Sequence, residues 1–377
     1  LAAMAEVGVL AVFGVAILLA VTIFPTLLAY LPVAEKMLIR SRRHRNRVCN
    51  EYPELSDMRV DCPKTADFSA GLAEVAATVR RCYHLTGVSA LAGVEDYTEG
   101  IYHGDPQTDY HQAQRRQHTY LLDEVGADSG FRLLEIGCGL GTLMCAAQAR
   151  GCEVTGVTIS EDQYAVCQAR GLRVVLSDYR ALPREWTGAF DGIIINGALE
   201  HFCQPTDARD GQQDRIYEHM FGILARLLDP VSLSRRVVTT ALHFRGAHVA
   251  PSKLLRSPFL QVFDRQGFHF AILHRGYGGY YPVAGQLEHC ARGFFRLVRE
   301  VDGTQDYRFT AEDWLRMFRG ALCRRFGAAL FGHFVHDPAH TFWFTASFLG
   351  PASQLWQFRG VPTPVQHFRH TWEAVSD

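Results

Sequence analysis

A short glycine-rich segment between an apolar run and a helical stretch constrains the fold of this 377-residue chain most strongly. The apolar run is Phe131 to Ile136, and the segment Glu135-Ile-Gly137-Cys-Gly139-Leu-Gly141 ends it. Glycines at such a turn let the backbone approach a ligand, and the next helix begins with unpaired amides that suit an anionic group. The spacing is GxGxG, whereas a dinucleotide fingerprint is spaced GxGxxG, so the turn disfavours NAD.

Apolar runs that alternate with helical stretches indicate an α/β fold with a parallel sheet and helices on both faces. The predicted strands are Phe131 to Ile136, Glu153 to Ile159, Arg173 to Leu176, Phe190 to Ile195 and Arg236 to Leu242. The clearest helix is predicted from Asp214 to Leu228. Hydrophobic residues make up 48% of the chain, enough to bury the core that such a sheet requires.

A long uncharged stretch near the N-terminus predicts a membrane anchor. No charged residue occurs from Val7 to Ala34, and a helix over Val7 to Phe24 would be about 27 Å long, close to a bilayer core. Arginines follow between Arg40 and Arg47, as on a cytoplasmic flank. A signal peptide would carry its positive charges before a shorter apolar region, and a buried core helix is the other alternative. We predict a single-pass protein of the inner (cytoplasmic) membrane with its catalytic domain in the cytosol.

Charge and cysteine content exclude two other classes of function. The formal net charge of -1 gives no general attraction to nucleic acid. The ten cysteines form no CxxC pair and no His/Cys spacing suited to zinc, so we read them as reduced thiols and predict no metal site.

A second motif follows the second predicted strand and identifies a family. Gly156-Val-Thr158-Ile-Ser160-Glu-Asp-Gln163 resembles the GVTxSxxQ segment of cyclopropane-fatty-acid synthases and mycolic-acid methyltransferases, which are class I methyltransferases that use S-adenosylmethionine (SAM). Further segments resemble that family in the same order, from about Tyr97 to Gly360: Asp178-Tyr179-Arg180, Phe190-Asp191, Glu200-His201, Leu242-His243, Tyr307-x-x-Thr310-x-x-x-Trp314 and Gln354-Leu-Trp-Gln357.

The resemblance implies a Rossmann-like methyltransferase sheet and a set of residues around SAM. These residues are Tyr97, Thr98, Glu135, Gly137, Gly139, Gly141, Thr158, Ser160, Gln163, Asp178 and Tyr179. Taken singly, the glycines fit a tight turn and Asp178 fits a helix cap. The expected domains are an anchor with its basic flank (1–47), a linker with an amphipathic helix over Phe68 to Tyr83 (48–95), a SAM-binding core (96–244) and a lipid-substrate region that completes the fold (245–377).

The family's reaction adds a methyl group to an alkene of an acyl chain, and closure to a cyclopropane then requires removal of a proton. The resemblance assigns this proton to a bound bicarbonate and matches Glu200 and His243 to the residues around it. Otherwise Glu200 would cap a loop and His243 would lie in the core. Tyr97-Thr98-Glu99 replaces the family's YSC, so a third catalytic candidate, Glu99, would repel bicarbonate or replace it as proton acceptor. Arg245 is a candidate to offset its charge.

Substrate and product therefore stay open at the level of the sequence. The expected substrate is a membrane phospholipid or another acyl lipid, and the product is a ring, a methyl branch or a methylene branch. An N- or O-methyltransferase of another small or lipidic substrate is the alternative. A binding protein without activity would be expected to have lost glycines of the turn, and this chain keeps them. Aromatic residues could line an acyl tunnel or belong to core helices: Phe294, Phe295, Trp314, Phe318, Phe331, Phe334, Phe342, Trp343 and Phe344.

Overall fold

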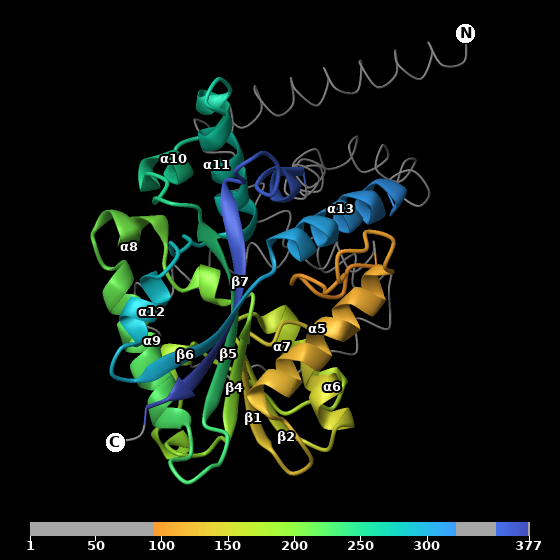
Figure 1. The fold of residues 1–377 in the computed structure, drawn as a ribbon, viewed down its shortest axis with the longest axis vertical. Coiled ribbons are helices and arrows are strands. Elements are labelled where there is room, and N and C mark those ends of the chain that lie inside the picture. The colour runs from red at the N-terminus through yellow and green to blue at the C-terminus, as the bar shows by residue number, and fades with distance from the viewer. Residues whose placement is uncertain (1–92, 322–351, 376–377) are drawn as a thin grey trace, which may run out of the picture. The chain divides into compact units, whose positions relative to one another are not determined.

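The computed structural model describes residues 93–321 and 352–375, which contain a seven-stranded sheet (Figure 1). The strand order is β3-β2-β1-β4-β5-β7-β6. Five strands are parallel, namely β1 (Arg132–Ile136), β2 (Glu153–Thr158), β3 (Val174–Leu176), β4 (Gly192–Asn196) and β5 (Arg236–Phe244). β7 (Val365–Ala374) runs antiparallel to both β5 and β6 (Phe295–Asp302). The parallel α/β sheet predicted from the sequence is confirmed, with two strands added.

Helices cover both faces of this sheet. Figure 1 shows α5, α6 and α7 on one face and α9 and α12 on the other. The helices are α5 (Tyr110–Val125), α6 (Thr142–Ala149), α7 (Glu161–Ala169), α8 (Pro205–Arg209), α9 (Gln213–Leu227), α10 (Pro251–Leu255), α11 (Arg265–Tyr277), α12 (Gln286–Ala291) and α13 (Thr304–Ala321). Short 3-10 turns are η1 (Tyr179–Ala181), η2 (Arg184–Trp186), η3 (Leu199–His201) and η4 (Pro258–Gln261).

The two cores follow from the alternation of side chains along the strands. Leu133 and Ile194 are buried on the face of α5 and α6, while their neighbours Leu134 and Ile193 are buried on the face of α9. Near-continuous apolar runs are therefore required in β1 and β4, and this requirement explains why both strands are readable in the sequence.

The strands and the helix predicted from the sequence agree with the structure to within two residues at each end. β6 and β7 were not predicted, and both lie in the region 245–377, so this region completes the sheet. The predicted amphipathic helix over Phe68 to Tyr83 lies outside the described residues.

The membrane anchor also lies outside the described residues, because its predicted span is Val7 to Phe24. Within the ranges that the structure describes, no helix combines the length and the apolar character needed to cross a bilayer.

Candidate functional site

The carboxyl ends of the parallel strands gather most of the residues predicted for the site. Glu135 lies near the end of β1 and the glycine turn follows that strand, Thr158 ends β2, Asp178 follows β3 and Glu200 follows β4. Ligands of open α/β sheets bind outside this edge. The order of the strands thus explains how motifs far apart in the sequence converge.

The three glycines of the turn differ in what requires them. All have a positive φ, but a Cβ on Gly137 would lie 2.3 Å from Ala198 Cβ, and one on Gly141 would lie 2.3 Å from Leu172 Cδ1. A Cβ on Gly139 would meet nothing within 4 Å. Gly137 and Gly141 are therefore needed for packing, whereas Gly139 leaves open space beside the turn.

Glu135 is a buried carboxyl that the described protein leaves partly unsatisfied. Its side chain is 3% exposed, and Oε2 has no hydrogen-bond partner among the described residues. Burial raises the pKa of Glu135 well above its usual value, and the nearby Asp96 raises it further. A cationic ligand would offset the cost of this carboxylate, so the turn fits the sulfonium and ammonium groups of SAM.

The segment after β2 is organised by its own side chains. Ser160 caps α7 by accepting a hydrogen bond from Gln163 N at 3.3 Å, and Thr158 Oγ1 donates to Gln163 Oε1 at 2.8 Å. All three side chains are buried at the sheet edge. Their shared role is to fix the start of α7 beside the glycine turn.

Asp178 and Tyr179 form the next part of this edge. Asp178 caps η1 and binds the Arg180 guanidinium through both carboxylate oxygens, at 2.9 and 2.8 Å. Tyr179 stacks on Phe202 with ring centroids 4.1 Å apart, and its hydroxyl has no partner among the described residues. Asp178 therefore caps η1, and Tyr179 offers a polar group for a ligand.

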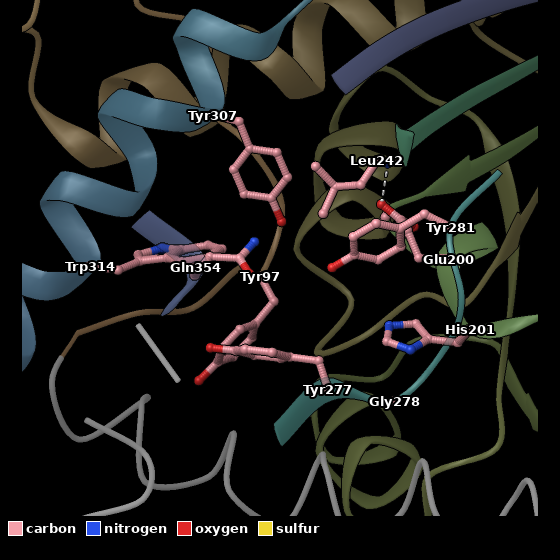
Figure 2. A pocket seen from close by; sticks show the side chains of 11 residues that line it. Tyr97, Glu200, His201, Leu242, Tyr277, Gly278, Tyr281, Tyr307, Trp314 and Gln354 are labelled. Atoms are coloured by element: carbon pink, nitrogen blue, oxygen red, sulfur yellow. Dashed lines mark hydrogen bonds between the residues drawn. The ribbon is translucent and has the colours of Figure 1, made fainter. Parts of the chain in front are cut away.

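A pocket with aromatic walls lies beside this edge (Figure 2). Its lining comprises Tyr97, Gly197, Glu200, His201, Leu242, Tyr277, Gly278, Tyr281, Tyr307, Trp314 and Gln354. In Figure 2 the aromatic rings and the Glu200 carboxyl surround the same space. The pocket thus combines apolar walls with one acidic group.

Glu200 is held in place by two hydrogen bonds. Its Oε1 accepts a hydrogen bond from Leu242 N at 2.8 Å, and its backbone carbonyl accepts one from Tyr280 N at 3.1 Å. Oε2 is buried and has no partner among the described residues. Burial raises the pKa of Glu200 to about 7. This carboxyl can therefore change its charge near neutral pH.

Glu99 lies outside the pocket lining, in a buried ion-pair cluster. Arg369 Nε donates to its Oε1 at 3.0 Å, and His367 Nε2 lies 3.1 Å from Oε2. Burial would raise the pKa of Glu99, but the charges of His367 and Arg369 outweigh it and hold the pKa at about 2. A carboxylate in this state is a weak base, which argues against the predicted role of Glu99 as proton acceptor.

The structure also places Arg245 and His243 differently from the sequence predictions. Arg369, which the sequence did not single out, offsets the charge of Glu99, whereas Arg245 donates to Thr363 Oγ1 at 3.0 Å. His243 follows Leu242 on β5, so the two side chains point to opposite faces of the sheet. His243 lies against Phe368 and His370, and Leu242 lines the pocket. His243 is therefore a core residue in this structure.

Sequence reasoning also missed a buried polar network behind Thr98. Gln117 donates to Asn196 Oδ1 at 2.9 Å, Thr240 donates to the same oxygen at 2.9 Å, and Asn196 Nδ2 donates to Thr98 Oγ1 at 3.4 Å. Asn196 was visible as a polar residue that ends an apolar strand. The network positions the segment that carries Tyr97.

The aromatic residues proposed as an acyl tunnel divide into four groups. Trp314 lines the pocket, Phe295 and Phe318 are buried in the core, and Phe294 is 36% exposed. The others, Phe331 to Phe344, lie outside the described residues. Tyr277 and Tyr281, which the sequence did not indicate, supply much of the aromatic wall instead.

Comparison with known proteins shows which family part of this chain resembles. Residues 93–261 match the family described as mycolic acid cyclopropane synthetase. The methoxy mycolic acid synthase MmaA3 of Mycobacterium tuberculosis is 35% identical over 101 residues, 24% of this chain and 33% of that protein. A probable fatty acid methyltransferase of Pseudomonas putida is 32% identical over 145 residues, 34% of this chain and 36% of that protein. The chain spans about a third of the length of these two relatives.

Solved structures share the fold over most of the chain. The cyclopropane synthase MmaA2 from Mycobacterium tuberculosis has a TM-score of 0.61 at 17% identity, over 80% of this chain and 98% of that one. The mycolic acid cyclopropane synthase CmaA1, complexed with S-adenosylhomocysteine and CTAB, has a TM-score of 0.57 at 18% identity, over 79% and 97%. At these identities the likeness concerns the fold.

Proposed function

We propose, on the premise that residues 93–261 belong to the mycolic acid cyclopropane synthetase family, that the protein transfers a methyl group from SAM to an unsaturated acyl chain of a membrane lipid. One observation carries this proposal. Two buried carboxyls, Glu135 and Glu200, lie at the carboxyl edge of the sheet, each with an oxygen that lacks a partner among the described residues. Such a pair suits a cationic methyl donor beside a substrate that becomes positively charged.

The chain's residues divide the work as follows. Glu135, Gly139 and Tyr179 would hold SAM, which supplies an electrophilic methyl group when bound. The aromatic walls exclude water and orient the alkene, which matters because an isolated alkene is a poor nucleophile. The Glu200 carboxylate stabilises the positive charge that develops on the acyl chain.

The departing proton requires an acceptor, and Glu200 is the acidic residue of the pocket lining. Its pKa of about 7 allows it to take a proton near neutral pH. Bicarbonate, the acceptor implied by the family resemblance, is the alternative, and added bicarbonate would then stimulate turnover. Loss of a proton from the new methyl group gives a ring, or a methylene branch after a hydride shift, whereas loss of a proton from the acyl chain gives a methyl-branched alkene.

A second candidate function is methylation of an amine. Aromatic rings together with a carboxylate also suit a substrate ammonium group, and Tyr97, Tyr281 and Trp314 surround the same space as Glu200 (Figure 2). An N-methyltransferase would methylate small amines and leave acyl chains unchanged. Incubation with each substrate class therefore separates the two functions.

Cofactor binding is tested by a substitution in the open part of the turn. Gly139→Leu places a side chain in the space beside the turn, so calorimetry should show loss of SAM binding of about a hundredfold or more. Gly130→Leu is the matched control, because Gly130 also has a positive φ and open space around its Cβ position. Equal affinities in the two folded variants would sink the SAM assignment.

We also propose that Val7 to Phe24 anchors the protein in the membrane, with the catalytic domain in the cytosol. The uncharged stretch and the arginines that follow it support this proposal. Carbonate washing should leave the full-length protein in the membrane fraction. Its release into the supernatant would refute the anchor.

A further inference from the structure

A group of exposed apolar side chains lies at one end of α11, distant in sequence from the glycine turn. Leu255 is 38% exposed, Leu260 76%, Val262 55% and Phe263 101%. We call these four residues the apolar tip. They lie on and between α10, η4 and the start of α11. Figure 1 shows α10 and α11 together at one end of the described fold.

The backbone that carries the apolar tip is held by hydrogen bonds from side chains and by a helix cap. Gln261 is 5% exposed, and its Nε2 donates to Lys253 O at 2.9 Å. Arg275 Nη1 donates to Arg256 O at 3.1 Å. Asp264 caps α11 by accepting from Gly267 N at 3.1 Å. The fold thus holds these apolar side chains in solvent on an ordered backbone. A group of exposed apolar residues needs an explanation that a single exposed residue does not.

Basic residues surround the apolar tip. Between residues 250 and 278 the chain has four basic residues and one acidic residue, although the whole chain is close to neutral. The acidic residue, Asp264, is paired with Lys253 at 2.9 Å. Arg256 and Arg265 are exposed. Exposed aromatic and aliphatic side chains flanked by arginines are typical of proteins that lie in the interface of an anionic membrane.

We propose that the apolar tip is a docking surface for an anionic lipid bilayer. The apolar side chains would enter the boundary between headgroups and acyl chains, and Arg256 and Arg265 would contact the headgroups. An acidic carrier protein would also pair with Arg256 and Arg265, but the four apolar side chains beside them are better matched by the acyl chains of a bilayer.

The position of α11 connects this surface with the pocket. Its last residue, Tyr277, and the following Gly278 line the pocket. A helix of 13 residues is about 20 Å long, comparable with the depth of one leaflet, about 15 Å. An acyl chain that leaves the bilayer at the apolar tip and follows α11 would therefore reach most of the distance from the apolar tip to the pocket. This last step rests on the proposed function, whereas the docking itself does not.

Hydrogen exchange of the full-length chain tests the docking without SAM or substrate turnover. The protein would be compared in detergent micelles, in nanodiscs of phosphatidylcholine and in nanodiscs that also contain phosphatidylglycerol. Amides of residues 255–263 should exchange about tenfold more slowly with phosphatidylglycerol than in the other two conditions. Because activity is not measured, failure of the proposed function would leave this result unchanged.

Matched variants make the test specific. Leu260→Ser with Phe263→Ser should abolish the slower exchange, and Arg256→Gln with Arg265→Gln should remove the difference between the two lipid compositions. Val231→Ser with Leu233→Ser is the control, since these side chains are 83% and 104% exposed elsewhere in the fold, and it should change nothing.

Three results would overturn the proposal. The first is equal exchange in all three conditions. The second is exchange that is already slow in detergent, which would mean that another segment of the chain covers the apolar tip. The third is slow exchange that requires an added acidic carrier protein and not the anionic lipid.

Discussion

At the residue scale, Glu200 lines the pocket, and its charged form destabilises the fold because the carboxyl is buried. Its folded pKa of about 7 lies above the ordinary value of 4.5. Because the pKa of Glu200 is higher in the folded chain than in the unfolded chain, this group stabilises the fold at pH values below 4.5. The contribution is lost as the pH rises through about 7. At higher pH the charged Oε2 remains buried without a partner among the described residues, a cost in stability of the kind that functional sites commonly carry.

Glu200→Gln should therefore have opposite effects on activity and stability. Turnover should fall about a hundredfold, as for loss of one preorganised charge, with SAM affinity unchanged. The shift of Glu200 from 4.5 to about 7 corresponds to about 3 kcal/mol, so urea unfolding at about pH 8 should show the variant more stable by about 2 to 3 kcal/mol. At about pH 4 this gain should vanish, and a gain independent of pH would contradict the assigned pKa.

The pKa of Glu99 is shifted in the opposite direction from that of Glu200. Its depressed pKa of about 2 gives stability that is present above about pH 4.5 and is lost as pH falls toward 2. Glu99→Gln leaves the buried Arg369 with Asp306 as its remaining acidic partner, so the fold should lose about 2 to 3 kcal/mol at neutral pH.

Thermal unfolding and turnover of Glu99→Gln together separate structure from catalysis. If the variant is as stable as the wild type but loses ring formation, Glu99 is a proton acceptor after all. Asp306→Asn, which keeps the contact between Glu99 and Arg369, serves as the comparison and should be milder.

At the element scale, the loop after α11 determines where Glu200 lies. A Cβ on Gly279 would lie 2.0 Å from the Glu200 carbonyl oxygen, at a φ of +79°. Gly279→Ala should therefore displace the backbone of Glu200, lower stability by about 2 kcal/mol and reduce turnover. Gly285→Ala has the same φ of +79° with open space around its Cβ. Equal turnover in both variants would show that the loop does not position Glu200.

The burial of each strand explains why some strands can be predicted from the sequence and others cannot. β1 and β4 are buried on both faces, so local apolar runs reveal them. β7 buries His367, Arg369 and His370, and Arg369 is tolerated there only because Glu99, 270 residues away in the sequence, pairs with it. A local pattern contains no trace of such a partner. β6 is largely exposed and lacks the alternation of a core strand.

At the scale of the whole described molecule, the motifs predicted which edge of the sheet would carry the site, because parallel strands bring their ends together. They did not predict which matched residues face the pocket. Leu242 and His243 belong to one motif, yet only Leu242 lines the pocket, since adjacent strand residues face opposite ways. Tyr277 and Tyr281 depend on the path of a loop that has no motif.

Transfer of a labelled methyl group from SAM to an acyl chain is the reaction proposed for this protein, and mass spectrometry can follow it. The full-length protein would be incubated with SAM that carries a trideuterated methyl group and with vesicles of unsaturated phospholipid, and the acyl chains would be analysed by mass spectrometry. We predict chains that gain one carbon from the labelled methyl group, in the wild type and in Gly130→Leu but not in Gly139→Leu. Retention of two deuterons would indicate a ring or a methylene branch, and retention of three a methyl branch. Unlabelled acyl chains together with a labelled small amine would refute methylation of acyl chains and favour an N-methyltransferase.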